Sequence, residues 1–242
     1  MITWHRRPLV GLDFETTGTD PERDRIVTGC VVIYGGGQPT EARTWIADPG
    51  VAIPAEATAV HGVTTEAART AGRPAAAVVT EITAALVAAV GQGWPIVAMN
   101  AAYDLTMLDR EARRHGVTPL FDLVTPHVID PKVLDKRVDR FRRGGRTLAD
   151  LCRHYVVALD GAHSADTDAI AACAVVWKIG LRHRWLTRLA LEALHAEQVR
   201  WAYEQQSGLR DHFARTPGKE QLAATVRLEW PLIPAPRVGE PS

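Results

Sequence analysis

The chain has 242 residues, of which 46% are hydrophobic, and its 28 basic and 28 acidic side chains leave no net charge. This length and composition predict one globular domain with an appendage, or two small domains, and exclude wholesale disorder and a collagen-like repeat. The balanced charge argues against nucleic-acid binding by bulk electrostatics. A polyanionic partner would need a local basic patch or metal ions.

The cysteines and the apolar segments bear on location. Cys30, Cys152 and Cys173 are far apart and odd in number, which is typical of reduced thiols in a reducing compartment. The longest uncharged run, residues 82–103, is interrupted by Gly91, Gly93 and Pro95. No stretch of signal-peptide form follows the first residues. We expect a cytoplasmic protein without a membrane-spanning segment.

In chain order, β-branched and apolar runs predict strands and amphipathic runs predict helices. The expected strands cover residues 8–14, 25–34 and 40–47, which form an antiparallel meander, and then residues 95–99 and 123–129. The expected helices cover residues 74–90, 101–115, 147–155 and 164–180, and residues 131–146 are expected to be charged and irregular. This order predicts an α/β fold with helices packed on a mixed sheet.

The pattern changes after residue 180. Residues 181–214 form a long amphipathic run, followed by a shorter helical stretch and a Pro-rich tail. We expect a domain over residues 1–180 and a helical extension over residues 181–242.

The spacing Asp-x-Glu occurs three times, as Asp13/Glu15, Asp20/Glu22 and Asp109/Glu111. Only the first pair follows an expected buried strand, where residues two apart project from the same face. Two like charges placed there repel one another, and a bound cation relieves the repulsion. An exposed strand end is the alternative interpretation.

Two further segments place acidic residues at helix starts. Asn100 precedes an expected helix with Asp104 in its first turn, and His163 lies five positions before Asp168 in another. Each has a simple alternative, because acidic side chains stabilise helix N-termini. All three segments lie at strand ends or helix starts near one sheet edge. Four carboxylates in one pocket would need cations, and two divalent ions form the arrangement that promotes phosphodiester hydrolysis.

These segments, Asp13-Phe14-Glu15-Thr16-Thr17-Gly18, Asn100-x-x-x-Asp104 and His163-x-Ala165-x-x-Asp168, resemble the three motifs of the DEDDh family of DnaQ-like 3′–5′ exonucleases. That family includes the proofreading (epsilon) subunit of bacterial DNA polymerase III. Val60-His61-Gly62-Val63-Thr64 resembles a further family segment between the first two motifs. The resemblance covers residues 8–180.

The resemblance implies an RNase H-like exonuclease fold, with a five-stranded mixed sheet flanked by helices. It implies that Asp13, Glu15, Asp104 and Asp168 ligate two Mg²⁺ or Mn²⁺ ions and that His163 activates the attacking water. The substrate-binding residues that it implies are Phe14, Thr16, Thr17, His61 and Asn100. Met99 departs from the family, since many members have histidine there, and we expect altered substrate contacts.

Residues 132–146 hold seven basic and two acidic side chains. We expect this segment to contact phosphates, with Arg142, Arg143 and Arg146 as substrate-binding residues whose contribution falls with salt. The alternative is a solvated loop.

The leading hypothesis is a 3′–5′ exonuclease that releases nucleoside 5′-monophosphates from single-stranded DNA in proofreading or repair. Two alternatives stay open: an exoribonuclease of the RNase T or oligoribonuclease type, and a module that binds a polymerase or another replication or repair partner through residues 181–242, with secondary nuclease activity.

Overall fold

In the computed structural model of the chain, residues 3–159 and 164–235 are described. The first three long strands form the expected antiparallel meander: β1 (Pro8–Thr16), β2 (Ile26–Gly35) and β3 (Glu41–Asp48). The turn after β2 contains Gly35, Gly36 and Gly37, all with φ near +70° to +80°. Glycine adopts this left-handed conformation without steric cost, so the turn reverses the chain tightly.

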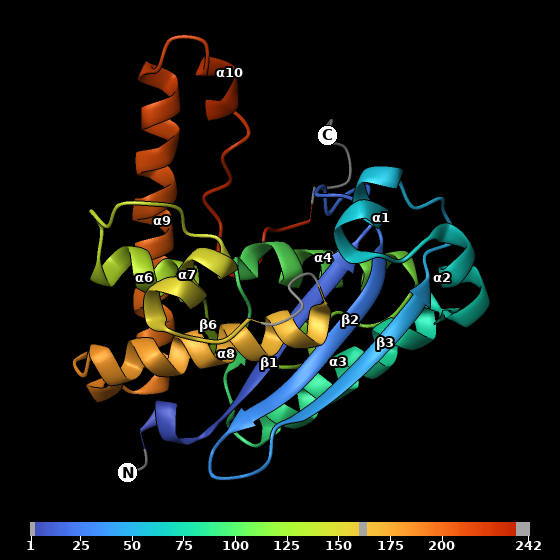
Figure 1. Cartoon of the computed structure of the whole chain (residues 1–242), viewed down its shortest axis with the longest axis horizontal. Coiled ribbons are helices and arrows are strands. Elements are labelled where there is room, and N and C mark those ends of the chain that lie inside the picture. Colours follow the sequence, from blue (N-terminus) through green and yellow to red (C-terminus); the bar gives the residue numbers. More distant parts are fainter. Residues whose placement is uncertain (1–2, 160–163, 236–242) are drawn as a thin grey trace.

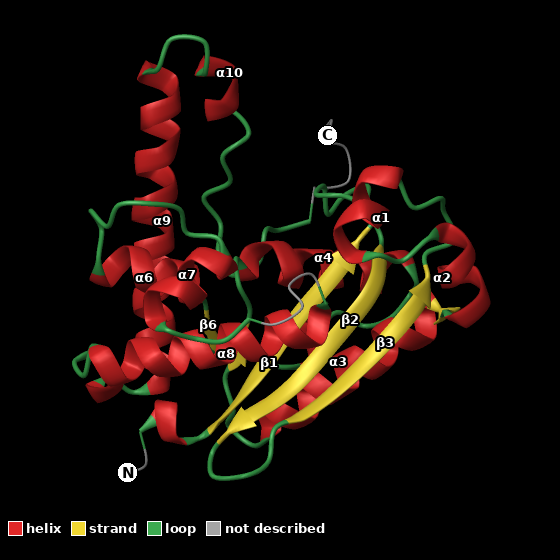
Figure 2. Cartoon of the chain, in the orientation of Figure 1, coloured by secondary structure: helices red, strands yellow, loops and turns green. Residues whose placement is uncertain are grey.

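The complete sheet has six strands in the order β4-β3-β2-β1-β5-β6, shown in yellow in Figure 2. The short strands β5 (Ile96–Val97) and β6 (Val128–Ile129) extend it in parallel from β1. The expected count of five was one too low, because β4 (Arg73–Pro74) pairs with the end of β3. A two-residue strand has no periodicity by which a sequence could reveal it.

Helices cover both faces of the sheet (Figure 1). On one face, α3 (Ala75–Gly91) contacts β2, β3 and α4 (Ala101–Arg114). On the other face, α8 (Ala165–Arg182) crosses β1 and β2. The mixed α/β fold flanked by helices is therefore confirmed.

Shorter helices connect these layers: α1 (Ala55–His61), α2 (Thr65–Ala71), α5 (Leu120–Leu123), α6 (Pro131–Val138) and α7 (Leu148–Tyr155), together with the 3₁₀ turn η1 (Trp4–Arg6). Two expectations were wrong here. The start of the expected strand 123–129 belongs to α5, and the first half of the expected irregular segment 131–146 is helix α6. Asp130 caps α6 and Pro131 occupies its first turn, which is a helix-start signal present in the sequence.

The C-terminal part contains the 3₁₀ turn η2 (Leu186–Arg188), the long helix α9 (Leu191–Arg215) and the short helix α10 (Glu220–Ala223). The far end of α9 projects from the body and carries α10, from which the chain descends again (Figure 1). Leu186, Leu194, Trp201 and Trp230 belong to the same buried cluster as the sheet. A boundary at residue 180 stays a prediction.

None of the described helices has the length and apolar character needed to cross a membrane.

Packing of α8 on β1 depends on the missing side chain of Gly11. A Cβ there would lie 2.8 Å from the carbonyl oxygen of Ala169 and 2.9 Å from Sγ of Cys173. Ala169 follows Asp168 directly, so this close approach also sets the distance between Asp168 and the end of β1.

Gly11→Ala should therefore lower the free energy of unfolding by about 1–3 kcal/mol, since an added methyl group forces these elements apart. Urea denaturation measures the change. Gly208→Ala in α9 is the matched control, because a Cβ there meets no atom within 4 Å. The control should gain about 0.5–1 kcal/mol through helix propensity. Equal stability of the two variants would contradict the close contact between α8 and β1.

Candidate active site

Three of the four predicted acidic ligands lie together at the end of β1. Asp13 and Glu15 are two residues apart on one strand and project from the face that α8 covers. Asp168 lies in the first turn of α8. One carboxylate oxygen from each of the three lies within 4.8 Å of the other two. The strand and the helix thus bring together acids that are 155 positions apart in the sequence.

The fourth acid, Asp104, approaches from α4. It lies in the first turn of this helix and its side chain is buried. Burial raises the pKa of Asp13 well above its usual range, and the charges of Asp104, Asp168 and Glu15 raise it further. Burial likewise raises the pKa of Asp104, while backbone N–H groups, including that of Phe14, act in the opposite direction. All four predicted carboxylates therefore share one electrostatic environment.

The pKa of Glu15 responds to the same environment. Burial, followed by repulsion from Asp168, raises its pKa from 4.5 to about 7. Within the described residues, no ion pair joins Asp13, Glu15 or Asp104 to a lysine or arginine. The charges of these acids are not neutralised by the described side chains.

The other Asp-x-Glu pairs behave differently. Asp109 is bound by Arg110 and Arg113, and its side chain is 2% exposed. Glu111 pairs with Arg114 and Glu22 pairs with Arg110. Asp109 and Glu111 on α4 thus have arginine partners, whereas the described lysines and arginines form no ion pair with Asp13, Glu15 or Asp104. The sequence contained these arginines, but which acid each one contacts is decided by the fold.

The acidic cluster of Asp13, Glu15 and Asp168, with Asp104 beside it, fits divalent cations. Carboxylate oxygens are the ligands that Mg²⁺ and Mn²⁺ prefer. A bound cation would remove the repulsion that raises the pKa of Asp13 and Glu15. Binding of a proton or of a cation therefore lowers the electrostatic free energy of the cluster.

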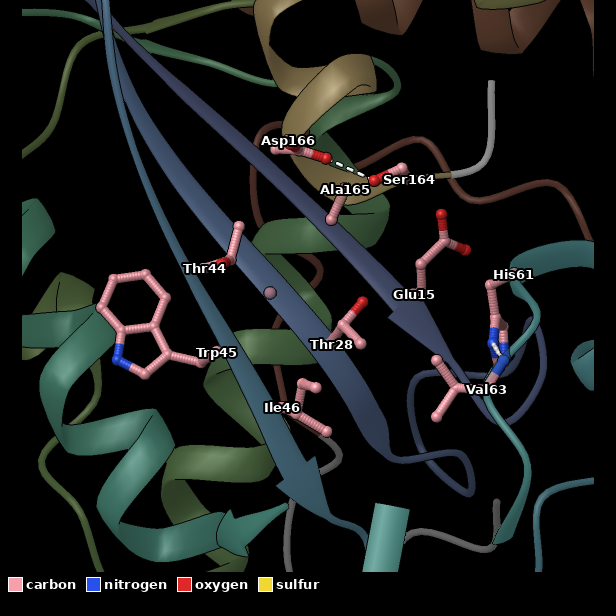
Figure 3. A pocket seen from close by; sticks show the side chains of 11 residues that line it. Glu15, Thr28, Thr44, Trp45, Ile46, His61, Val63, Ser164, Ala165 and Asp166 are labelled. Atoms are coloured by element: carbon pink, nitrogen blue, oxygen red, sulfur yellow. Dashed lines mark hydrogen bonds between the residues drawn. The ribbon is translucent and has the colours of Figure 1, made fainter. Parts of the chain in front are cut away.

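A pocket of about 310 Å³ begins beside Glu15 (Figure 3). Its base is formed by β1, β2 and β3, and its rim by the start of α8 and the segment around His61. His61 accepts a hydrogen bond at Nδ1 from the backbone N–H of Val63, and burial lowers its pKa. The lowered pKa favours the neutral form of the His61 imidazole, which lines the pocket together with Glu15. His163, the predicted general base, lies outside the described residues.

The residues around Glu15 differ in what they offer to a substrate. The ring of Phe14 is buried in the core on the opposite face, close to Gly29. Thr17 is also buried and donates a hydrogen bond to Asp24. The hydroxyl of Thr16 lies 2.7 Å from that of Tyr103. Of Phe14, Thr16 and Thr17, only Thr16 is partly buried, and it directly follows Glu15.

Tyr103 is a residue that the sequence analysis did not single out. Its hydroxyl donates to the carbonyl oxygen of Gly18 at 2.7 Å, so it ties α4 to the loop after β1. The tyrosine directly before Asp104 was visible in the sequence, but its partners 85 and 87 positions away were not.

Asn100 and Met99 lie where β5 leads into α4. Asn100 adopts the left-handed conformation with φ of 64°, and its Oδ1 accepts a hydrogen bond from Nζ of Lys132 at 3.1 Å. Asn100 is exposed, whereas Met99 is half-buried against the core. Asn100 is thus available at the surface beside the helix that carries Asp104.

The three arginines predicted to bind phosphate divide into two kinds. Arg142 and Arg146 turn inward, with side chains 10% and 17% exposed, and both bind Oδ2 of the fully buried Asp135. Tyr155 donates to the other oxygen of that carboxylate. Arg143 is exposed. The structure therefore gives Arg142 and Arg146 a role in holding the loop after α6.

The raised pKa of Glu15 makes a prediction for the metal-free protein. Between pH 4.5 and about 7 the folded state holds a proton that the unfolded state releases, so stability falls as the pH rises through this range. In EDTA at pH 8, Glu15→Gln should raise the free energy of unfolding by about 1–2 kcal/mol, a value reduced for solvent screening of a partly exposed group. At pH 4 the variant and the wild type should have the same melting temperature.

The exposed Glu41→Gln is the control and should show no pH-dependent gain in stability. A Glu15→Gln variant less stable than wild type at pH 8 would contradict the repulsion.

Comparison with known proteins supports the motif assignment. A family profile described as exonuclease, of the RNase T type, matches residues 10–176. No curated protein sequence is similar enough to count as a relative. Many solved structures share the fold, and Exonuclease I provides three examples. Exonuclease I of E. coli in complex with a dT13 oligonucleotide is 18% identical with a TM-score of 0.64. The aligned region covers 74% of this chain and 42% of the Exonuclease I chain. Exonuclease I of Methylocaldum szegediense is 21% identical with a TM-score of 0.62, covering 83% and 45%. An ExoI/SSB-Ct complex is 17% identical with a TM-score of 0.60, covering 75% and 42%.

The chain thus spans less than half the length of the Exonuclease I chains that it matches. Similarity to the polymerase III proofreading subunit in particular stays a prediction. The family profile covers more than half of this chain, including Asp13, Glu15, Asp104 and Asp168. The chain therefore belongs to the DEDDh-type, DnaQ-like exonuclease family.

Proposed function

We propose that this protein is a metal-dependent 3′–5′ exonuclease that removes nucleoside 5′-monophosphates from the ends of single-stranded DNA. The observation that carries the proposal is the cluster of Asp13, Glu15 and Asp168, with Asp104 beside it, in a chain of the exonuclease family. The structural similarity to an Exonuclease I bound to a dT13 oligonucleotide supports single-stranded DNA as the substrate class.

In this proposal Asp13, Glu15, Asp104 and Asp168 hold two Mg²⁺ or Mn²⁺ ions. When bound, such ions supply activation of the attacking water and neutralisation of charge on the leaving oxygen. His163, five positions before Asp168, takes the proton from the attacking water. The pocket beside Glu15 receives the terminal nucleotide. His61 lines this pocket, Thr16 follows Glu15 on β1, and Asn100 precedes the helix that carries Asp104. In this proposal these three residues orient the nucleotide.

The repulsion within the cluster also serves the reaction. A buried set of like charges has a low affinity for a further anion, so a phosphodiester enters only where cations reverse the local sign. Neutral His61 adds no charge of its own to this region. Substrate binding should therefore depend on the same cations as the chemical step.

A digestion experiment tests activity, direction and substrate class together. Single-stranded DNA labelled at its 3′ end should release labelled mononucleotide at once, whereas the same strand labelled at its 5′ end should shorten progressively. Asp13→Asn and Asp168→Asn should lower the rate by at least about 10³-fold, and EDTA should abolish it. His163→Gln should lower it by about 10²–10⁴-fold.

The exposed Asp211→Asn in α9 is the matched control and should retain the wild-type rate. Wild-type hydrolysis by Asp13→Asn protein would overturn the proposal. RNA of the same sequence is the second substrate. Faster degradation of RNA than of DNA would instead assign the exoribonuclease function, because the 2′-hydroxyl is the difference present at every nucleotide of the strand.

We further propose that Arg143, and not its neighbours, contacts the phosphate backbone. Arg143→Ala should reduce the slope of log affinity against log salt by about 1, measured by fluorescence anisotropy on a DNA strand with Ca²⁺ in place of Mg²⁺. Arg146→Ala should instead cost about 1–3 kcal/mol of folding stability, because it leaves the buried Asp135 with one ion-pair partner fewer. An unchanged salt slope in Arg143→Ala protein would remove this residue from the substrate path.

A replication or repair partner that binds residues 181–242 also stays a proposal. The projecting end of α9 offers a surface for it (Figure 1).

A further inference from the structure

Asp130, at the end of β6, makes an unusual number of hydrogen bonds for one buried carboxylate. Its side chain is almost fully buried. Oδ1 accepts from the backbone N–H groups of Lys132 (2.8 Å), Asn100 (3.3 Å) and Val133 (3.4 Å). Oδ2 accepts from the N–H of Ala101 (3.0 Å) and from Nε1 of Trp230 (3.4 Å). One side chain therefore joins three segments that are distant in the sequence.

Two of these donors begin the helix that carries Asp104. Asn100 is held in the left-handed conformation that turns the chain from β5 into α4, and Ala101 is the first residue of α4. Asp104 follows within the same turn. The hydrogen bonds from Asn100 and Ala101 to Asp130 thus fix the start of the turn in which this predicted metal ligand lies.

The third segment is the C-terminal one. After α10 the chain returns to the body, and Trp230 is buried there with its ring against His195, 5.4 Å between centroids. Further along, the backbone N–H of Ile233 donates to Oγ1 of Thr106, at 3.0 Å. Arg110 donates to the carbonyl oxygens of Ile233 and Pro234. Residues 230–234 therefore contact α4 directly at Thr106 and Arg110. They also contact its first turn indirectly, through Asp130.

The chemistry of Asp130 shows why a carboxylate is needed. Both of its oxygens face only donors, three on one side and two on the other. An asparagine would turn an NH₂ group toward donors in either of its two orientations. Capping of α6 requires only one acceptor oxygen, Oδ1. The second oxygen, Oδ2, accepts from Ala101 of α4 and from Trp230.

We propose that Asp130 and Trp230 are positioning residues, which hold the first turn of α4 and so place Asp104 against Asp13 and Glu15. The C-terminal segment thereby forms part of the support of the metal site. This inference rests on the proposed function insofar as Asp104 is a metal ligand. It gives a role to a segment that lies beyond the residues matched by the exonuclease family profile.

Two conservative variants of the full chain test the proposal. Trp230→Phe keeps an aromatic ring and removes only the N–H donor, and Asp130→Asn keeps the shape of the side chain. Isothermal titration calorimetry with Mn²⁺ alone measures the affinity of the site without substrate. Asp130→Asn should weaken Mn²⁺ binding by about 10-fold and Trp230→Phe by about 3-fold, since groups that orient metal ligands typically change affinity by 10–100-fold when lost completely. The Mg²⁺ concentration for half-maximal hydrolysis should rise in parallel.

Matched controls separate positioning from general destabilisation. Trp185→Phe changes a tryptophan that is 43% exposed, and Asp211→Asn changes an exposed aspartate. Both should bind Mn²⁺ as the wild type does. Thermal melting identifies any variant that is not folded at the assay temperature, and Trp230→Phe then decides the question if Asp130→Asn fails this criterion.

The outcomes are distinguishable. Wild-type Mn²⁺ affinity in folded Trp230→Phe and Asp130→Asn proteins would overturn the positioning role while leaving the nuclease assignment intact. A wild-type protein that neither binds Mn²⁺ nor hydrolyses DNA would overturn both. Weakened Mn²⁺ binding in the two variants, with the controls unchanged, supports the proposal.

Discussion

Repulsion among four carboxylates at the end of β1 is the constraint around which this structure is organised. Asp13 and Glu15 share a face because strand residues alternate, and Asp168 reaches them because Gly11 lets α8 approach closely. Isolated carboxylates in such an environment are costly, and they persist only when protonated or bound to cations. The packing of the fold thus holds these carboxylates close together, and their repulsion favours the binding of positive charge.

Two buried acids outside this cluster, Asp109 and Asp135, are paired with arginine. Asp109 is held by Arg110 and Arg113, and Asp135 by Arg142 and Arg146. These pairs are structural, because removing one partner would leave a buried charge without compensation. The zero net charge of the chain therefore conceals an uneven distribution, with ion-paired acids in one part and an acidic cluster at the end of β1 in another.

Much of the site could be predicted from the sequence because its signals are local. The spacing of Asp13 and Glu15 on a strand and the helix starts at Asp104 and Asp168 are short-range features. Because side chains alternate along a strand, Asp13 and Glu15 occupy the same face of the sheet. The six strands were predicted less well. The two-residue strand β4 has no sequence pattern, and α6 was missed although Asp130 and Pro131 form a helix-start signal.

The sequence by itself determined the motif set, the three long strands of the meander and the presence of helices packed on the sheet, since each follows from residue type and local periodicity. That helices flank the sheet was implied by the family resemblance. Only the tertiary structure decided which acids have arginine partners, that Arg142 and Arg146 turn inward, and that Trp230 reaches Asp130 across 100 positions. Such contacts depend on how elements pack, and the linear spacing of residues carries no record of which distant side chains will meet. For this reason the acidic residues of the site could be identified from short sequence patterns, whereas the contacts that position them depend on the tertiary structure.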